Sequence, residues 1–274
     1  MSGERIRKNY YEIQLDSLRE SIIGKHRKCK GAGFLERVSA ESQGEFVVKF
    51  MIKCKCRKKF DILSRLFLSN IPYKSLINQH IYGKVVTDEI SGEKIELRKE
   101  VVKPYVKNIK KAVVNPYGLL FLGKNGTGKT FVGLKIAYYT ILGGLTAHAI
   151  ELSDFLKMAR KTFDGDREAE NFISEITDVD ILLIDEIGSE SKRSEYVISE
   201  FKSLFKKRVS NGKPTILISN YNFDEFKKVY GRSIYSMIRS YCRVLDFSDA
   251  VDVRISKDAV ERDAFFRKIK RKKK

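Results

Sequence analysis

One stretch constrains the fold of this chain more than any other, residues 118–130, which read Gly-Leu-Leu-Phe-Leu-Gly-Lys-Asn-Gly-Thr-Gly-Lys-Thr. The apolar run Leu119–Leu122 predicts a buried strand, and the apolar spacing over Phe131–Leu142 predicts a helix. Between them stands a complete G-x-x-x-x-G-K-[ST] motif. A strand, a glycine-rich loop and a helix in this order are the context in which the motif indicates a nucleoside triphosphate site.

The residue types of this loop explain how it would bind ATP. Its glycines let the backbone turn tightly, so that successive N–H groups point at phosphates from a helix N-terminus. Lys129 would meet the β- and γ-phosphates, and the Thr130 hydroxyl would bind Mg²⁺. A glycine-rich turn that fits the motif by accident is the alternative, and the flanking strand and helix disfavour it. The predicted nucleotide-binding residues are Gly123, Lys124, Asn125, Gly126, Thr127, Gly128, Lys129 and Thr130.

A second apolar run, Ile181–Ile184, ends in the pair Asp185 and Glu186. It predicts a central strand of a parallel sheet, and ligands of such sheets bind at the carboxyl ends of the strands. We therefore expect Asp185 to hold Mg²⁺ and Glu186 to polarise the attacking water. Residues 215–219 predict a neighbouring strand, and Asn220 at its end would contact the γ-phosphate or that water. A plain strand-end cap is the alternative for Asn220.

Three of the four cysteines and one of the three histidines lie between residues 26 and 56. His26, Cys29, Cys54 and Cys56 would form a tetrahedral N/S₃ zinc site, and the alternating stretch before Cys54 suits a ribbon strand. Its role would be structural, because four protein ligands leave no position for substrate. Three unrelated thiols beside a surface histidine are the alternative. We place the domain boundary near residue 60, which gives a small zinc-ribbon-like module over residues 1–60 and an α/β nucleotide-binding domain over 61–274.

The net charge of +19 over 274 residues favours a polyanionic partner, for which nucleic acid is the first candidate. Solvated lysine-rich faces are the alternative. Lys157, Arg160 and Lys161 on a predicted helix, and the basic C-terminal run 266–274, are candidate DNA contacts. No apolar run approaches the roughly 18–20 residues of a membrane span. Without a signal-peptide pattern or a disulfide framework, we expect a cytoplasmic protein and no membrane partner.

The remaining pattern supplies further expectations for local structure. A helix should stop at Gly24, a hairpin should span residues 84–95, and a helix interrupted near Pro104 should span 95–111. Ser153 is the predicted N-cap of a helix that ends at Phe163, and residues 194–210 predict another helix. A short helix should begin at Tyr230 and a last strand should span 243–247. Cys242 is expected to be a small core residue.

With these motifs placed, the chain resembles the replicative-helicase loaders of the DnaC/DnaI type, a bacterial and phage branch of the AAA+ ATPases. The resemblance implies an AAA+ fold with a parallel central sheet and a slow, switch-like ATPase. It also implies an N-terminal module that grips a hexameric replicative helicase, binding of single-stranded DNA, and self-association into rings. The residues that carry it are the His26/Cys29/Cys54/Cys56 set, Ile71-Pro72, the 118–130 stretch, Leu182–Gly188, Ile218–Asn220 and Gly231–Ile238.

The resemblance further implies that an arginine from one subunit completes the ATP site of its neighbour. The family has arginine where Ser233 and Met237 stand here, so Arg232 or Arg239 would supply this group. Three alternative functions stay open at this point. They are a transposition helper ATPase of the IstB type, a nucleotide-gated DNA-binding protein with little hydrolysis, and a zinc-dependent transcription factor.

Overall fold

The computed structural model describes residues 10–24, 26–40, 47–76, 81, 84–189 and 194–250. The chain divides into two compact units, Met1–Leu68 and Ser69–Lys274. The division falls at the end of helix α2 (Lys55–Leu68), which includes residue 60, where the sequence analysis placed the boundary. The basic run 266–274 lies outside the described residues. Within the described part of the chain, no helix has the length and apolarity needed to cross a membrane.

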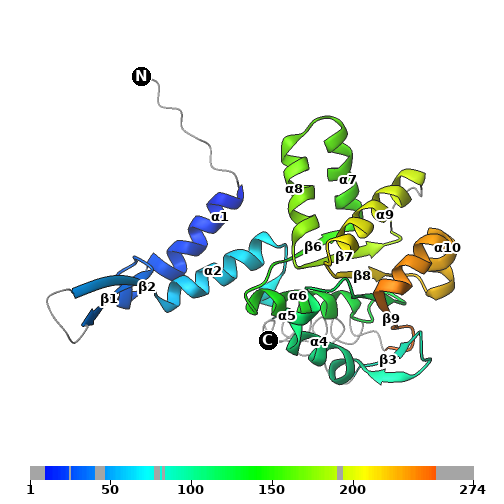
Figure 1. Cartoon of the computed structure of the whole chain (residues 1–274), viewed down its shortest axis with the longest axis horizontal. Coiled ribbons are helices and arrows are strands. Elements are labelled where there is room, and N and C mark those ends of the chain that lie inside the picture. The colour runs from blue at the N-terminus through cyan, green and yellow to red at the C-terminus, as the bar shows by residue number, and fades with distance from the viewer. Residues whose placement is uncertain are drawn as a thin grey trace, which may run out of the picture. The chain divides into compact units, whose positions relative to one another are not determined.

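The first unit contains a two-stranded ribbon flanked by helices (Figure 1). Helix α1 (Tyr10–Arg19) runs into a π-helical turn, η1 (Glu20–Gly24), which ends at the predicted glycine. A short turn, η2 (Arg27–Cys29), leads to β1 (Phe34–Ala40), which pairs antiparallel with β2 (Val47–Lys53). The predicted ribbon strand is therefore confirmed.

The second unit is built on a seven-stranded sheet in the order β4-β3-β9-β5-β8-β7-β6. The strands from β9 to β6 in this order are parallel, whereas β3 is antiparallel to both β9 and β4. Every residue of the central strands β5 and β8 is buried, which explains the apolar runs Leu119–Leu122 and Ile216–Ile218 within them. The bounds are β3 (Val85–Asp88), β4 (Lys94–Glu96), β5 (Gly118–Leu122), β6 (Ala147–Glu151), β7 (Ile181–Ile187), β8 (Thr215–Ser219) and β9 (Cys242–Asp246).

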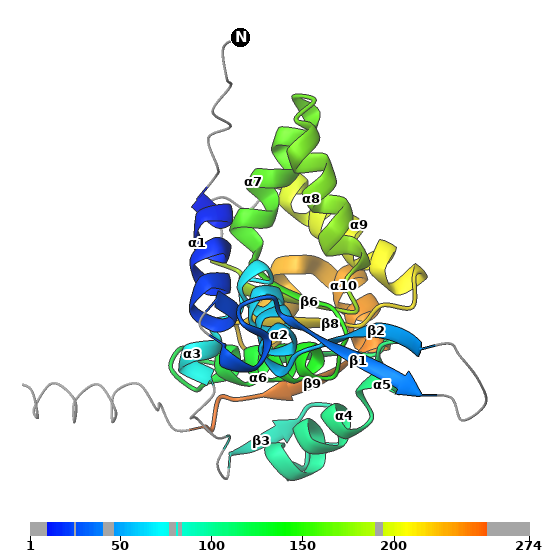
Figure 2. The same cartoon turned by 90° about the vertical axis from the view of Figure 1, so that its left-hand side faces the viewer.

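Helices cover both faces of this sheet, with α6 on one side and α7, α8 and α9 on the other (Figures 1 and 2). The main core lies between the sheet and α7–α10, where Leu217 and Ile184 of the strands share one cluster with Phe201 and Phe226 of the helices. The fold is the predicted α/β architecture with a mostly parallel sheet. The helices are α3 (Tyr73–Leu76), η3 (Arg98–Val102), α4 (Lys103–Lys107), α5 (Ile109–Ala112), α6 (Lys129–Leu142), α7 (Leu152–Phe163), α8 (Arg167–Asp178), α9 (Glu195–Ser210) and α10 (Phe223–Tyr241).

Two predicted helix starts before the Asp185 strand are wrong. The segment that begins at Ile95 opens as strand β4, because Ile95 pairs with Val86 across the β3–β4 hairpin. Helix α7 begins at Leu152 with Glu151 as its N-cap, so Ser153 already lies inside the first turn. Strand β6 leads into this helix without a loop, which leaves no room for a cap at Ser153.

The predicted short helix that begins near Tyr230 is confirmed as the part of α10 after Gly231, but the sequence analysis missed the part that precedes it. Helix α10 begins at Phe223, because Asn222 and Glu225 form a reciprocal capping box. A kink at Gly231, with φ 79° and ψ 161°, separates this first part from the cation-rich part that the sequence analysis recognised. The predicted last strand is confirmed as β9, and Cys242 at its start is buried in the core, as expected.

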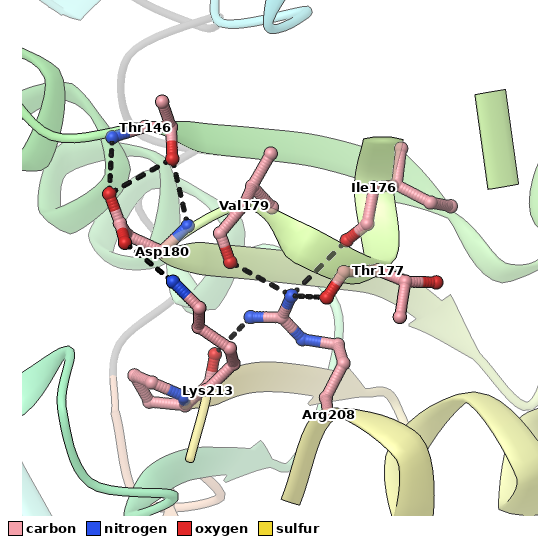
Figure 3. A network of polar contacts seen from close by, with 8 residues as sticks. Thr146, Ile176, Thr177, Val179, Asp180, Arg208 and Lys213 are labelled. Carbon is pink, nitrogen blue, oxygen red and sulfur yellow. Dashed lines mark hydrogen bonds and ion pairs between the residues drawn. The ribbon is translucent and has the colours of Figure 1, made fainter. Parts of the chain in front are cut away.

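A buried arginine joins the amino ends of β7 and β8 to the end of α8 (Figure 3). The Arg208 guanidinium of α9 donates hydrogen bonds at 2.6–3.2 Å to four backbone carbonyls and one hydroxyl. Burial lowers the pKa of Arg208 to about 10, and the nearby Asp178 and Asp180 oppose this shift. These hydrogen bonds hold together the amino ends of the strands, at the opposite end from the glycine-rich loop. The acceptors are the carbonyls of Ile176, Thr177, Val179 and Pro214 and the hydroxyl of Thr215.

Candidate nucleotide-binding site and metal centre

The glycine-rich loop connects the carboxyl end of β5 to the first residue of α6. Gly123 has φ 116°, and a Cβ atom there would lie 2.8 Å from the backbone nitrogen of Ser248, so this position requires glycine. Lys129 is 4% exposed, and its ammonium group donates to the carbonyls of Gly123 at 2.6 Å and Lys124 at 2.7 Å. The lysine therefore lies over the loop, with its charge held where phosphates would meet the helix N-terminus.

Asp185 and Glu186 lie near the end of β7, beside this loop. The Thr130 side chain hydrogen-bonds the Asp185 carboxylate. Burial raises the pKa of Asp185, while the Glu186 N–H, the Thr130 hydroxyl and the charge of Lys129 oppose the rise. The donor distance from the Glu186 nitrogen to Asp185 Oδ1 is 2.7 Å. A hydroxyl and a carboxylate in contact beside a lysine are the oxygen ligands that a phosphate-bound Mg²⁺ requires.

A bulge in β7 sets the direction of Glu186. The register with β8 shifts between Ile184 and Ile187, and Glu186 has φ 57°, a left-handed conformation that is uncommon for residues other than glycine. The carboxylate of Glu186 is half-buried. The bulge thus breaks the alternation of side chains between the two faces of the sheet at the two acidic residues, which lie near the carboxyl end of β7.

Two charged residues of this region were missed by the sequence analysis. Glu151 ends β6 directly opposite Asp185 in the parallel pairing, and its charge adds to the rise in the Asp185 pKa. The Lys84 ammonium group donates to the carbonyl of Thr127 inside the loop. Strand order would have revealed Glu151, because the residues at the carboxyl ends of adjacent parallel strands lie together. No sequence motif around Lys84 indicates its contact with the loop.

The end of β8 connects the loop to the turn that follows β7. Asn220 comes directly after β8, which pairs with both β5 and β7, so it lies at the same edge as the glycine-rich loop. The carbonyl of Tyr221 accepts from the Gly123 nitrogen at 2.9 Å, and its hydroxyl donates to the Gly188 carbonyl at 2.8 Å. A Cβ atom at Gly188 would lie 2.2 Å from the Tyr221 ring, so the ring and the turn fit only with glycine.

The two candidate arginines of α10 lie in different places. Arg232 follows the kink at Gly231 and is exposed. Arg239 is also exposed and lines a cavity of about 600 Å³ with Gly118 and Cys242, the first residues of β5 and β9. The glycine-rich loop follows the other end of β5, so Arg239 lies at the opposite edge of the sheet from the ATP loop of its own chain.

The three predicted basic residues of α7 are exposed, and two of them have partners. Lys157 forms an ion pair with Asp154 at 2.7 Å, and the Arg160 guanidinium lies 5.5 Å from the ring centre of Tyr196. Lys161 completes the group in the last turn of the helix. Because these side chains are exposed, they are accessible to a partner of any kind.

The first unit brings the four predicted metal ligands together. The ligand atoms of His26, Cys29, Cys54 and Cys56 all lie within 4.8 Å of one another. His26 Nδ1 lies 3.5 Å from the sulfurs of both Cys29 and Cys54, and the Cys29 and Cys56 sulfurs are 3.4 Å apart. This separation excludes a disulfide, whose sulfurs bond at about 2.05 Å, and is near the edge of about 3.8 Å in a zinc–thiolate tetrahedron.

The electrostatics of the cluster also suit a thiophilic cation. Burial opposes the charged form of Cys29, but hydrogen bonds from the Gly33 N–H and its cluster neighbours lower its pKa to about 6. Burial and the negative charge of its neighbours raise the pKa of Cys56 to about 12. A divalent cation would stabilise the thiolate forms of neighbouring thiols that disfavour one another's charge. Cys242 lies outside the cluster, and burial raises its pKa well above the usual range.

Fold and site together define the class of this protein. A parallel sheet with a P-loop after its central strand β5, and with an acidic pair at the carboxyl end of β7, is the arrangement of a P-loop ATP-binding protein. Residues 110–254 match the family described as IstB-like ATP binding protein. Because this match covers more than half of the chain, the protein belongs to that family.

Several relatives of this chain are named replicative helicase loader DnaC. The chain is 30% identical to that of Escherichia coli K12 over 128 residues, which are 46% of this chain and 51% of the relative. It is 30% identical to that of Buchnera aphidicola subsp. Baizongia pistaciae over 141 residues, 50% of this chain and 55% of the relative. The chain thus spans about half the length of the curated relatives it matches.

Two solved structures of similar proteins were also found. The crystal structure of the DnaC helicase loader aligns with a TM-score of 0.48 and 20% identity, and covers 53% of this chain and 85% of its own. The crystal structure of DnaI aligns with a TM-score of 0.44 and 18% identity, and covers 58% of this chain and 90% of its own.

Proposed function

We propose that this protein is an ATP-dependent loader that binds a hexameric replicative helicase and helps deliver it onto single-stranded DNA. The observation that carries the proposal is the pairing of a separate His/Cys unit with an AAA+ unit related to proteins named replicative helicase loader. Two units of this kind suit a protein that holds a partner with one part and responds to ATP with the other.

In this proposal, the first unit holds Zn²⁺ through His26, Cys29, Cys54 and Cys56 and provides the surface that contacts the helicase. The donor set and the 3.4–3.5 Å spacing support zinc over an accidental group of thiols. The ion would be structural, since it fixes η2, the ribbon and the start of α2 relative to one another.

The ATPase reaction would use residues of the second unit. The backbone of residues 123–130 and Lys129 would bind the phosphates, and Thr130 and Asp185 would hold Mg²⁺, which neutralises charge on the transferring phosphate. Glu186 would accept a proton from the attacking water, with Asn220 positioning that water or the γ-phosphate. Arg232 of a neighbouring subunit would complete the site, with Arg239 as the second candidate, which implies self-association. Turnover would be slow and switch-like.

The test is capture of partners by the tagged full chain, purified with zinc, from a lysate of the source cell. We expect a ring helicase in the eluate of the wild-type chain and of a Lys129→Ala variant. We expect none with a Cys54→Ser/Cys56→Ser variant, because the proposed contact depends on the first unit. Loss of the helicase with Lys129→Ala alone would contradict this division between the two units.

The second candidate function is a transposition helper ATPase, and the match to IstB-like ATP binding proteins favours it. Such a protein would bind duplex DNA and a transposase. The His/Cys unit weighs against this candidate. Recovery of a transposase instead of a helicase in the same capture would move the assignment to it.

A further inference from the structure

A pocket of about 340 Å³ lies on the second unit, away from the glycine-rich loop. It is bounded by η3, α4 and α6, and none of the eight residues 123–130 lines it. Its volume falls within the range of pockets that hold small ligands. The lining residues are Ile81, Arg98, Val102, Lys103, Val106, Lys107, Lys135 and Tyr139.

The lining combines cations with an apolar and aromatic surface. Four of the eight residues carry positive charge, and no carboxylate is among them. Val102 and Val106 provide the aliphatic part, and the half-buried Tyr139 provides a ring. A base can pack on such a surface while a phosphate meets the cations, which is the combination that single-strand binding proteins use.

Lys135 makes this pocket unusual. The side chain is 3% exposed, and its ammonium group donates to the Leu76 carbonyl and lies 5.3 Å and 5.4 Å from the ring centres of Tyr138 and Tyr139. Burial lowers the pKa of Lys135. Among the described residues, no carboxylate forms an ion pair with it, although buried charges are usually paired. An anion in the pocket would provide that pairing.

The positive charge extends beyond the pocket along the same segment. Residues 98–111 contain six cations and one acidic residue, Glu100. Lys99, Lys110 and Lys111 are exposed and lie outside the pocket lining, and Lys99 pairs with Glu96 at 2.5 Å. A free nucleotide would use only the pocket, whereas a polymer of phosphates would also meet this continuation. A concave pocket also requires an unstacked base, which a single strand offers and a duplex does not.

We propose that this pocket binds one nucleotide of single-stranded DNA, with the base against Tyr139 and the neighbouring phosphates along Arg98, Lys103 and Lys107. The inference rests on the proposed function in one respect, that the protein acts on single-stranded DNA. It adds the place where the strand is held, at a surface separate from the ATP loop.

The test measures binding of a fluorescein-labelled (dT)₂₀ oligonucleotide to the full chain by fluorescence anisotropy at several salt concentrations. A Lys103→Glu/Lys107→Glu variant should bind at least about tenfold more weakly. Its plot of log affinity against log salt should be less steep by about 1.4, because two phosphate contacts are lost. A Tyr139→Leu variant should bind about tenfold more weakly with an unchanged slope, because it removes stacking and no charge.

The matched control is Lys206→Glu/Lys207→Glu, the same change of charge at two exposed lysines of α9. It should stay within about twofold of wild type, since α9 contributes no residue to the pocket or to the basic segment 98–111. Equal losses in both charge variants would overturn the pocket and leave a general charge effect. Binding of thymidine monophosphate as tightly as the oligonucleotide would also overturn the proposal, in favour of a free nucleotide.

Two further measurements keep the outcome clear. Cross-linking of a 4-thiothymidine oligonucleotide to wild-type protein should modify the peptide that contains Tyr139, a result that needs no variant to fold. Fluorescent ATP should bind all variants equally. If the oligonucleotide results hold but no helicase is captured, the loader function fails and the pocket stands. If the helicase is captured and the oligonucleotide results fail, the pocket alone is refuted.

Discussion

Removal of zinc should unfold the first unit of this protein and leave the second unit folded. The buried cluster of the first unit, among its described side chains, consists of Ile23, Cys29, Cys54 and Cys56. Three of these four side chains are proposed zinc ligands. Ile22, Leu35 and Phe60 pack against this cluster, and Leu66 of α2 is also buried, so the described apolar packing of the unit, Leu66 apart, adjoins the metal site.

The free energies involved show that removal of zinc should have a large effect on the stability of the first unit. Full burial of one side chain such as Ile23 contributes about 3 kcal/mol at most, whereas ordering each residue costs about 1.5 kcal/mol. A structural zinc contributes roughly 10–16 kcal/mol, which equals or exceeds the total stability of about 5–15 kcal/mol of a typical domain. The ion pairs of Asp61 with Lys53 and Arg57 are partly exposed and add about 1 kcal/mol or less each.

Hydrogen exchange read by mass spectrometry would test this reasoning, with the zinc content measured on the same sample. The wild-type chain and a Cys242→Ala control should hold about one zinc ion each, because Cys242 lies outside the cluster. After chelation, peptides from α2 should lose protection and peptides from α9 should keep it. Unchanged protection of α2 in a chain proved free of zinc would refute the argument.

The other predictions concern the second unit. Lys129→Ala should weaken ATP binding by about tenfold to a hundredfold, since it removes a charged contact to phosphate, and a fluorescent ATP titration measures this. Glu186→Gln should bind ATP normally but lower turnover by about 10²–10⁴-fold in a phosphate-release assay, and wild-type rates would remove Glu186 from its role. Arg208→Leu should lower the free energy of unfolding by about 3–5 kcal/mol in urea, because it leaves buried carbonyls without donors. A loss below about 1 kcal/mol would mean that water replaces the guanidinium.

The ATP site was predictable because its signals are local in the chain. Gly123 to Thr130 and the Asp185-Glu186 pair each combine a strand, a turn and the functional side chains within about ten residues, and the structure brings the two segments together. The grouping of the four candidate metal ligands was predictable for a similar reason, since thiols and imidazoles are rare in this chain.

What the sequence analysis missed depends on contacts between distant segments. Glu151 lies next to Asp185 only because β6 pairs with β7, and Lys84 reaches Thr127 across 43 positions of the chain. The early start of α10 is different, because the Asn222 capping box is a local signal that went unused.

The left-handed backbone of Glu186 lowers the stability of the fold at a position whose carboxylate is proposed to take part in ATP hydrolysis. This conformation costs a residue with a side chain about 1–2 kcal/mol, and glycine would avoid most of that cost. A population of variants screened only for heat tolerance should therefore accumulate glycine or asparagine at position 186. Those survivors would lack the carboxylate proposed to polarise water, so the most robust descendants of this chain should be the ones that hold ATP and no longer hydrolyse it.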